Sequence, residues 1–132
     1  MVNSMSKLTQ LCTKSHNSWV REHRSRRGSD TSRIKSKNGQ FFDINLDWDY
    51  LNPLWQEESY KTHKSYISKV LPHINTKSNL EDVSDLVHQV WMEENQKHKD
   101  ESWCNHLFCD YNDLAESDKQ MDRNLATLLM EL

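Results

Sequence analysis

Two histidine–tryptophan pairs with the same spacing lie in the two halves of the chain. His16 and Trp19 are three residues apart, and so are His88 and Trp91. Residues three apart share one face of a helix, so each imidazole would lie beside an indole ring. Each histidine is either a core residue hydrogen-bonded to backbone or carboxylate, or the polar floor of a cleft in which the tryptophan is a stacking wall. No serine or cysteine stands at a recognisable spacing from them, which argues against nucleophilic catalysis.

Arginine and lysine are concentrated between Arg21 and Lys37, directly after the first of these pairs. Residues 1–72 contain 12 Lys and Arg against 7 Asp and Glu, whereas residues 73–132 contain 5 against 13. The basic segment is either a solvated loop that keeps the protein soluble or a site that attracts the phosphates of a ligand. Sequence-specific DNA binding is disfavoured because the acidic second half would repel DNA.

Three further side chains are candidates for binding, namely Arg123, Tyr50 and Tyr111. The guanidinium of Arg123 can pair with a carboxylate of the other half or reach the loop around Tyr111, or it can contact a phosphate or carboxylate of a ligand. Each tyrosine comes shortly before a predicted helix. There it is either half-buried packing or the wall of a cleft.

Hydrophobic periodicity predicts four helices, over residues 5–24, 53–71, 79–97 and 114–132. A polar loop is expected over residues 25–39. Between the first two helices, residues 41–50 alternate apolar and polar side chains, which predicts a half-buried extended segment. Leu107 and Phe108 are expected to pair with that segment as a short strand.

Two capping boxes are predicted at helix starts. Ser78 with Glu81 would open the third helix, and Asp113 with Glu116 would open the fourth. In such a box, each side chain accepts a hydrogen bond from the backbone N–H of the other residue.

The second half resembles the ryanodine receptor repeat, which also occurs in small bacterial and phage proteins. The motif is His-x-x-Trp on one helix, followed by a loop, Tyr-x-x-Leu, acidic residues, Lys and Asp-Arg at the start of a second helix. The match is clearest over the last 50 residues, and the aromatic–glycine element of the loop is absent. The matching residues are His88, Trp91, Tyr111, Leu114, Glu116, Lys119, Asp122 and Arg123.

The resemblance implies a tandem pair of repeats in a mainly α fold with short β-strands. The sequence itself predicts two degenerate helix–extended loop–helix repeats, over about 5–71 and about 79–132, with a linker at 72–78. Each repeat is too small to bury its apolar face alone. We therefore expect one compact domain, 1–132, in which the repeats share a core with approximate twofold symmetry.

Composition narrows the class of protein further. Only 2 glycines are present, which disfavours a β-sandwich or a glycine-rich nucleotide fold. No apolar run is long enough to cross a membrane, and no signal-peptide core precedes the first helix, so a soluble cytoplasmic protein is expected. The 3 cysteines are expected to be reduced, and their spacing fits no standard zinc pattern, so neither metal nor cofactor is predicted.

These observations predict a non-enzymatic binding module for a small anionic, nucleotide-like ligand in a cleft between the repeats. One version is a phage protein that sequesters a host signalling nucleotide. The alternative is an adaptor that docks a protein partner, or a second copy of itself, through its acidic helices or its basic loop. The candidate ligand-binding residues are His16, Trp19, Arg24, Arg26, Arg27, Tyr50, His88, Trp91, Tyr111 and Arg123.

Overall fold

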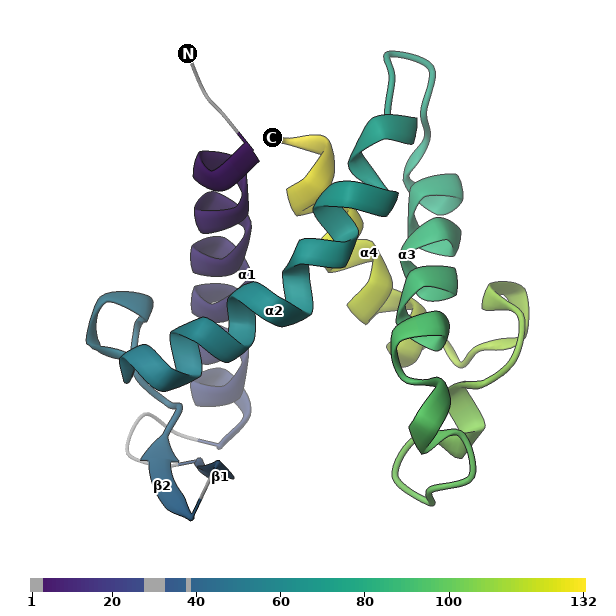
Figure 1. Cartoon of the computed structure of the whole chain (residues 1–132). Coiled ribbons are helices and arrows are strands. Elements are labelled where there is room, and N and C mark those ends of the chain that lie inside the picture. Colours follow the sequence, from purple (N-terminus) through teal and green to yellow (C-terminus); the bar gives the residue numbers. More distant parts are fainter. Residues whose placement is uncertain (1–3, 28–32, 38) are drawn as a thin grey trace. The chain divides into compact units, whose positions relative to one another are not determined.

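A computed structural model describes residues 4–27, 33–37 and 39–132 (Figure 1). The described part is mainly helical and contains one small antiparallel sheet, which confirms the predicted fold class at this level. Short 3-10 helices lie between the main elements. These elements are α1 (Ser4–Arg27), β1 (Ile34–Lys37), β2 (Gln40–Asp43), α2 (Pro53–Lys69), α3 (Leu80–Glu94) and α4 (Glu116–Met130).

The contacts between residues divide the chain into two units, unit 1 (Met1–Lys64) and unit 2 (Ser65–Leu132). The boundary lies inside α2, which begins in unit 1 and ends in unit 2. The shared core and the twofold symmetry of two repeats stay predictions.

A β-hairpin in unit 1 replaces the predicted long extended segment. Strand β2 ends at Asp43 and pairs with β1, which lies in the stretch predicted to be a polar loop. Gly39 takes a φ of +78° beside the turn, a left-handed conformation that glycine adopts without steric cost. The predicted strand at Leu107 and Phe108 is also wrong, because Leu107 ends the 3-10 helix η4 (Asn105–Leu107).

Both predicted capping boxes are wrong as well. Helix α3 is capped by Asn79, whose side chain accepts a hydrogen bond from the N–H of Asp82 at 2.9 Å. The hydroxyl of Ser78 serves the preceding turn instead, where it accepts from the N–H of Asn75. At α4 the N-cap is Ala115, which has no side-chain hydrogen bond, and Asp113 belongs to the 3-10 helix η5 (Tyr111–Asp113).

Each unit buries its own set of apolar side chains. In unit 2, α3 packs against both α4 and η5, as the apolar stripes of those helices predict. The larger buried side chains of unit 1 are Leu8, Leu11, Val20, Phe42, Ile44, Trp48 and Leu51, and those of unit 2 are Tyr66, Val70, Val83, Val87, Val90, Tyr111, Leu114 and Leu129.

In the described part of the chain, each helix is too short or too polar to cross a lipid bilayer. The three cysteines are free thiols, as predicted, and Cys12 and Cys104 are buried.

Candidate functional site

The polar face of α1 fixes the segment that follows the hairpin. The Nε2 atom of His16 lies 2.7 Å from the carbonyl oxygen of Leu46, and the side-chain oxygen of Asn17 accepts a 2.8 Å hydrogen bond from the N–H of Trp48. These bonds satisfy backbone groups in a stretch without regular structure. Residues 44–48 are therefore held at a defined place beside α1.

Arg24 supports the same segment and is not a free anion site. Its Nε atom donates to the side-chain oxygen of Asn45 at 3.0 Å, and its Nη2 atom donates to the backbone oxygen of Asn45 at 3.1 Å. A third guanidinium nitrogen lies 3.8 Å from the carboxylate of Asp47. Arg26 and Arg27 belong to α1, but their side chains lie outside the described residues.

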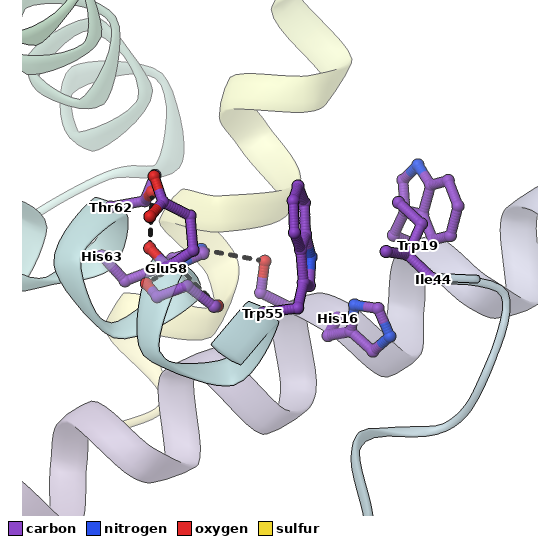
Figure 2. Close-up of a pocket in the computed structure, with 9 residues that line it drawn as sticks. His16, Trp19, Ile44, Trp55, Glu58, Thr62 and His63 are labelled. Carbon is purple, nitrogen blue, oxygen red and sulfur yellow. Dashed lines mark hydrogen bonds between the residues drawn. The ribbon is translucent and has the colours of Figure 1, made fainter. Parts of the chain in front are cut away.

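A cavity of about 280 Å³ opens between α1 and the first turns of α2, inside unit 1 (Figure 2). This volume is just below the range of small-molecule sites, roughly 300–1,000 Å³. Ile44, at the end of the hairpin, also lines it. The full lining consists of Ser15, His16, Trp19, Ile44, Trp55, Glu58, Ser59, Thr62 and His63.

The two tryptophans of the cavity differ in how they are packed. Trp19 stacks on His23, with ring centroids 4.9 Å apart and planes 12° apart, and also stacks on His16 at 6.0 Å. Trp55 is half-buried, and no described aromatic side chain stacks on it. Figure 2 shows His16 between the two indoles. Trp19 is thus fixed by stacking, whereas Trp55 lines the cavity without a described stacking partner.

The hydrogen bonds of His63 and His16 define which ring nitrogen carries the proton. In His63, Nδ1 lies 2.9 Å from the carbonyl oxygen of Ser59, which can only accept, so Nδ1 is protonated. The Nε2 atom of His63 then accepts from the hydroxyl of Ser15 at 3.2 Å. In His16 the Nε2 atom donates to the Leu46 carbonyl, so Nδ1 is left as an acceptor.

Both histidines are neutral near pH 7. Burial lowers the pKa of His16 and of His63 below the ordinary value of 6.5, and this outweighs the backbone hydrogen bonds that act in the opposite direction. The lining contains one carboxylate, Glu58, and neither lysine nor arginine. The cavity therefore presents acceptors and aromatic faces, without a cation of its own.

In unit 2, His88 is a core residue, as one of the two readings of its motif predicts. The residue is only 2% exposed, with Nε2 2.8 Å from the carbonyl oxygen of Cys109 and Nδ1 3.4 Å from a carboxylate oxygen of Asp122. Trp91 lies parallel to the His88 ring, 7° between planes, and also contacts Phe108. His88 is therefore buried in unit 2, and the half-buried Trp91 packs against it.

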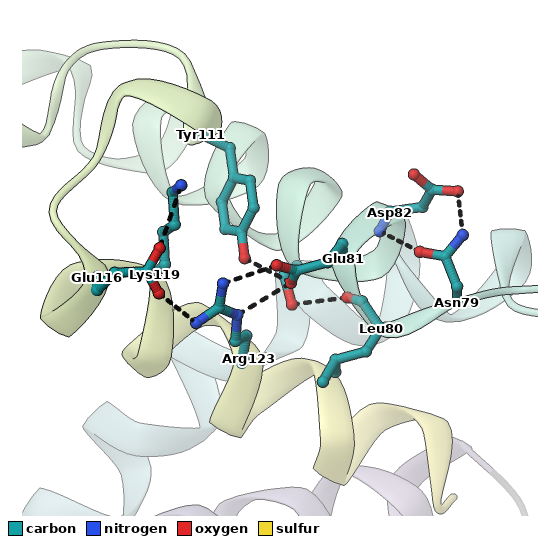
Figure 3. Close-up of polar contacts among 9 residues, drawn as sticks. Asn79, Leu80, Glu81, Asp82, Tyr111, Glu116, Lys119 and Arg123 are labelled. Carbon is teal, nitrogen blue, oxygen red and sulfur yellow. Dashed lines mark hydrogen bonds and ion pairs between the residues drawn. The ribbon is translucent and has the colours of Figure 1, made fainter.

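Arg123 and Tyr111 belong to a polar network inside unit 2 (Figure 3). The guanidinium of Arg123 donates to both carboxylate oxygens of Glu81, at 2.9 and 2.7 Å, and also to Glu116 at 3.0 Å. The hydroxyl of Tyr111 donates to Glu81 at 2.8 Å. These hydrogen bonds lower the pKa of Glu81 to about 2. Arg123 therefore has a structural role. The carboxylate that it binds, Glu81, belongs to α3 of the same half of the chain and not to the other half.

The structure therefore brings together two of the predicted ligand-binding residues, His16 and Trp19, in one cavity. Tyr50 is 77% exposed in the 3-10 helix η1 (Trp48–Tyr50) and does not line it. The α2 side of the cavity was not predicted from the sequence. The signal was present as polar and aromatic residues at helical spacing on one face of α2, namely Trp55, Glu58, Ser59 and Thr62.

Comparison with protein-family models, with curated proteins and with solved structures found no match to this chain. The resemblance to the ryanodine receptor repeat stays a prediction. Among the described residues, no group of three or more His, Cys, Asp or Glu side chains is arranged to hold a metal ion.

Proposed function

We propose that the chain is a non-enzymatic binding module whose unit 1 cavity takes a planar nitrogen heterocycle, such as the base of a nucleotide. The observation that carries the proposal is the unstacked indole of Trp55 in a cavity that also contains the acceptor Nδ1 of His16 and the carboxylate of Glu58. An aromatic face binds a flat ring, and the acceptors select rings that carry N–H donors.

The chemistry of the lining predicts which bases bind best. Adenine, cytosine and guanine carry exocyclic amino groups that can donate to Glu58 or His16, whereas uracil has none. Stacking of a base on an aromatic side chain contributes about 1–3 kcal/mol. A donor–acceptor match to a charged group adds about 1.5–3 kcal/mol. We expect the amino-bearing bases to bind more tightly than uracil.

The cavity is poorly suited to nucleophilic catalysis even though Ser15 and His63 form a hydroxyl–imidazole pair. Ser15 lies in the middle of α1, where backbone N–H groups are engaged in helix hydrogen bonds. An acyl-transfer site needs N–H groups that are free to stabilise an oxyanion. The pair is better explained as a hydrogen bond that joins α1 to α2.

Sequestration of a host signalling nucleotide by a phage protein is one form of this function. A second candidate, the protein adaptor, is favoured by a different feature of unit 1. Ile34 and Phe41 are 53% and 75% exposed on the outer face of the hairpin. Such side chains are available to a protein partner.

Isothermal titration calorimetry with adenosine, cytidine, guanosine and uridine tests the proposal. We expect saturable binding of at least one amino-bearing nucleoside and weaker binding of uridine, with ribose as the control for the sugar. Trp55→Ala should abolish most of the binding. If none of the nucleosides binds, the function proposed for the cavity is wrong.

A further inference from the structure

Arg33, which directly precedes β1, lies opposite Ile44, a residue of the cavity lining. The N–H of Ile44 donates to the carbonyl oxygen of Arg33 at 2.8 Å, which continues the antiparallel register beyond the pair Ile34 and Asp43. Residues directly opposite each other in such a ladder have their side chains on the same face, with Cβ atoms roughly 4.5–5.5 Å apart. The Arg33 side chain is therefore on the same face as Ile44, which lines the cavity.

A second cation follows on that face. Lys35 pairs with Phe42, and these residues are two positions along each strand from Arg33 and Ile44. Because side chains alternate along a strand, Lys35 and Arg33 share the inner face of the hairpin. The two cations form a short strip that leads away from the cavity.

Within the described residues, no structural contact accounts for the charge of the Arg33 side chain. The residue is exposed, and its hydrogen bonds in the described part of the chain involve only its backbone, since its N–H donates to the carboxylate of Asp43 and its carbonyl oxygen accepts from the N–H of Ile44. No described side chain pairs with its guanidinium. This distinguishes it from Arg24, whose three guanidinium nitrogens face Asn45 and Asp47.

We infer that Arg33 and Lys35 bind the phosphate of the ligand whose base occupies the cavity, so that the ligand class is a nucleoside phosphate. The inference rests on the proposed function. The cavity lining has no cation and one carboxylate, so a phosphate is excluded from it and has to lie outside. Arg33 lies next to the cavity edge at Ile44, and a guanidinium matches the geometry of phosphate oxygens.

Calorimetry with a matched pair of ligands, adenosine and adenosine monophosphate, tests the assignment. For the unmodified chain we expect the monophosphate to bind about tenfold more tightly, since one charge-assisted contact is worth about that factor. Arg33→Gln should remove most of this gain and leave the affinity for adenosine unchanged. Lys61→Gln is the control, because Lys61 is an exposed cation of unit 1 on α2, paired with Glu57.

The outcomes separate this inference from the function on which it rests. The proposed phosphate site is wrong if adenosine binds and the monophosphate binds no more tightly than adenosine. It is also wrong if Lys61→Gln reduces the difference in affinity between the two ligands as much as Arg33→Gln does. In both cases the proposed base site is retained. If neither ligand binds, the base site is wrong.

The phosphate can come from a free nucleotide or from a single-stranded nucleic acid, and an oligoadenylate distinguishes them. Tighter binding of the oligomer, with an affinity that falls steeply with salt, identifies nucleic acid as the source. Equal affinity for the oligomer and the monophosphate identifies the free nucleotide.

Discussion

The Nε2 atom of His63 on α2 accepts a hydrogen bond from the hydroxyl of Ser15 on α1, with the two atoms 3.2 Å apart. Both residues line the unit 1 cavity. In this direction the bond requires a neutral His63, whereas in a protonated ring the Nε2–H group would donate to the oxygen of Ser15. Protonation of His63 therefore reverses the direction of the hydrogen bond between the two cavity walls.

Unit 1 is expected to lose stability as the pH falls below 6.5. The pKa of His63 and that of His16 are lowered by burial from the ordinary 6.5, so the unfolded chain binds protons first. Their contribution is fully present above pH 6.5 and is lost as the pH falls towards the lowered folded pKa. Thermal unfolding of the parent chain and of His63→Gln, measured at pH values above and below 6.5, tests this loss of stability. Equal slopes against pH in both would contradict the prediction.

His88 in unit 2 is expected to behave in the opposite way. Burial lowers its pKa, but hydrogen bonds to Asp122 and to the Cys109 carbonyl outweigh burial and raise the pKa above the ordinary 6.5. Its contribution to stability is full below pH 6.5 and is lost as the pH rises through the raised value.

A histidine-ring NMR titration measures this directly. The His88 signal should titrate above pH 6.5, and the midpoint should fall in Asp122→Asn. A His88 midpoint below those of His16 and His63 would contradict the assignment.

Two tryptophans of unit 1 should respond differently to replacement by alanine. Trp55 is half-buried at the cavity, so Trp55→Ala should keep the fold and weaken nucleoside binding about 10- to 100-fold through the loss of stacking. Trp48 is only 6% exposed, so Trp48→Ala should cost about 3–5 kcal/mol of folding free energy. Circular dichroism and calorimetry on both variants test the contrast. Unfolding of Trp55→Ala under conditions where the parent chain is folded would be evidence against its role as an open wall.

The cap of α3 provides a test of the local structure. Asn79→Ala removes the side chain that accepts from the Asp82 N–H and should cost about 1 kcal/mol. Ser78→Ala leaves this cap intact and should cost less. Urea unfolding of the two variants measures the difference. A larger effect of Ser78→Ala would restore the capping box predicted from the sequence.

The helices could be predicted from the sequence because their apolar stripes are regular. The stripe that contains Val83, Val87 and Val90 is buried as expected. Strand β1 could not be predicted, because Ile34 is the only apolar residue among its four and its pairing depends on the backbone of β2. The capping box at Ser78 was predicted wrongly for a local reason, because the hydroxyl of Ser78 accepts a hydrogen bond from the N–H of Asn75 in the preceding turn.

The site was predicted only in part. His16 and Trp19 could be selected because one helix face carries both. His88 and Trp91 have the same spacing, but His88 is buried in unit 2 and the half-buried Trp91 packs against it. Spacing alone therefore does not distinguish a cavity wall from a core. Trp55 and Glu58 were missed because their helical spacing shows that they share one face of α2, but it does not show that this face lies against α1.

The indole N–H signals of the 5 tryptophans provide the most direct test of the central claim. In a nitrogen-15 NMR spectrum recorded with increasing adenosine, the signals of Trp19 and Trp55 should shift saturably, while those of Trp91 and Trp103 in unit 2 stay in place. The absence of any shift with adenosine, cytidine and guanosine, or shifts confined to Trp91 and Trp103, would contradict a heterocycle-binding cavity in unit 1.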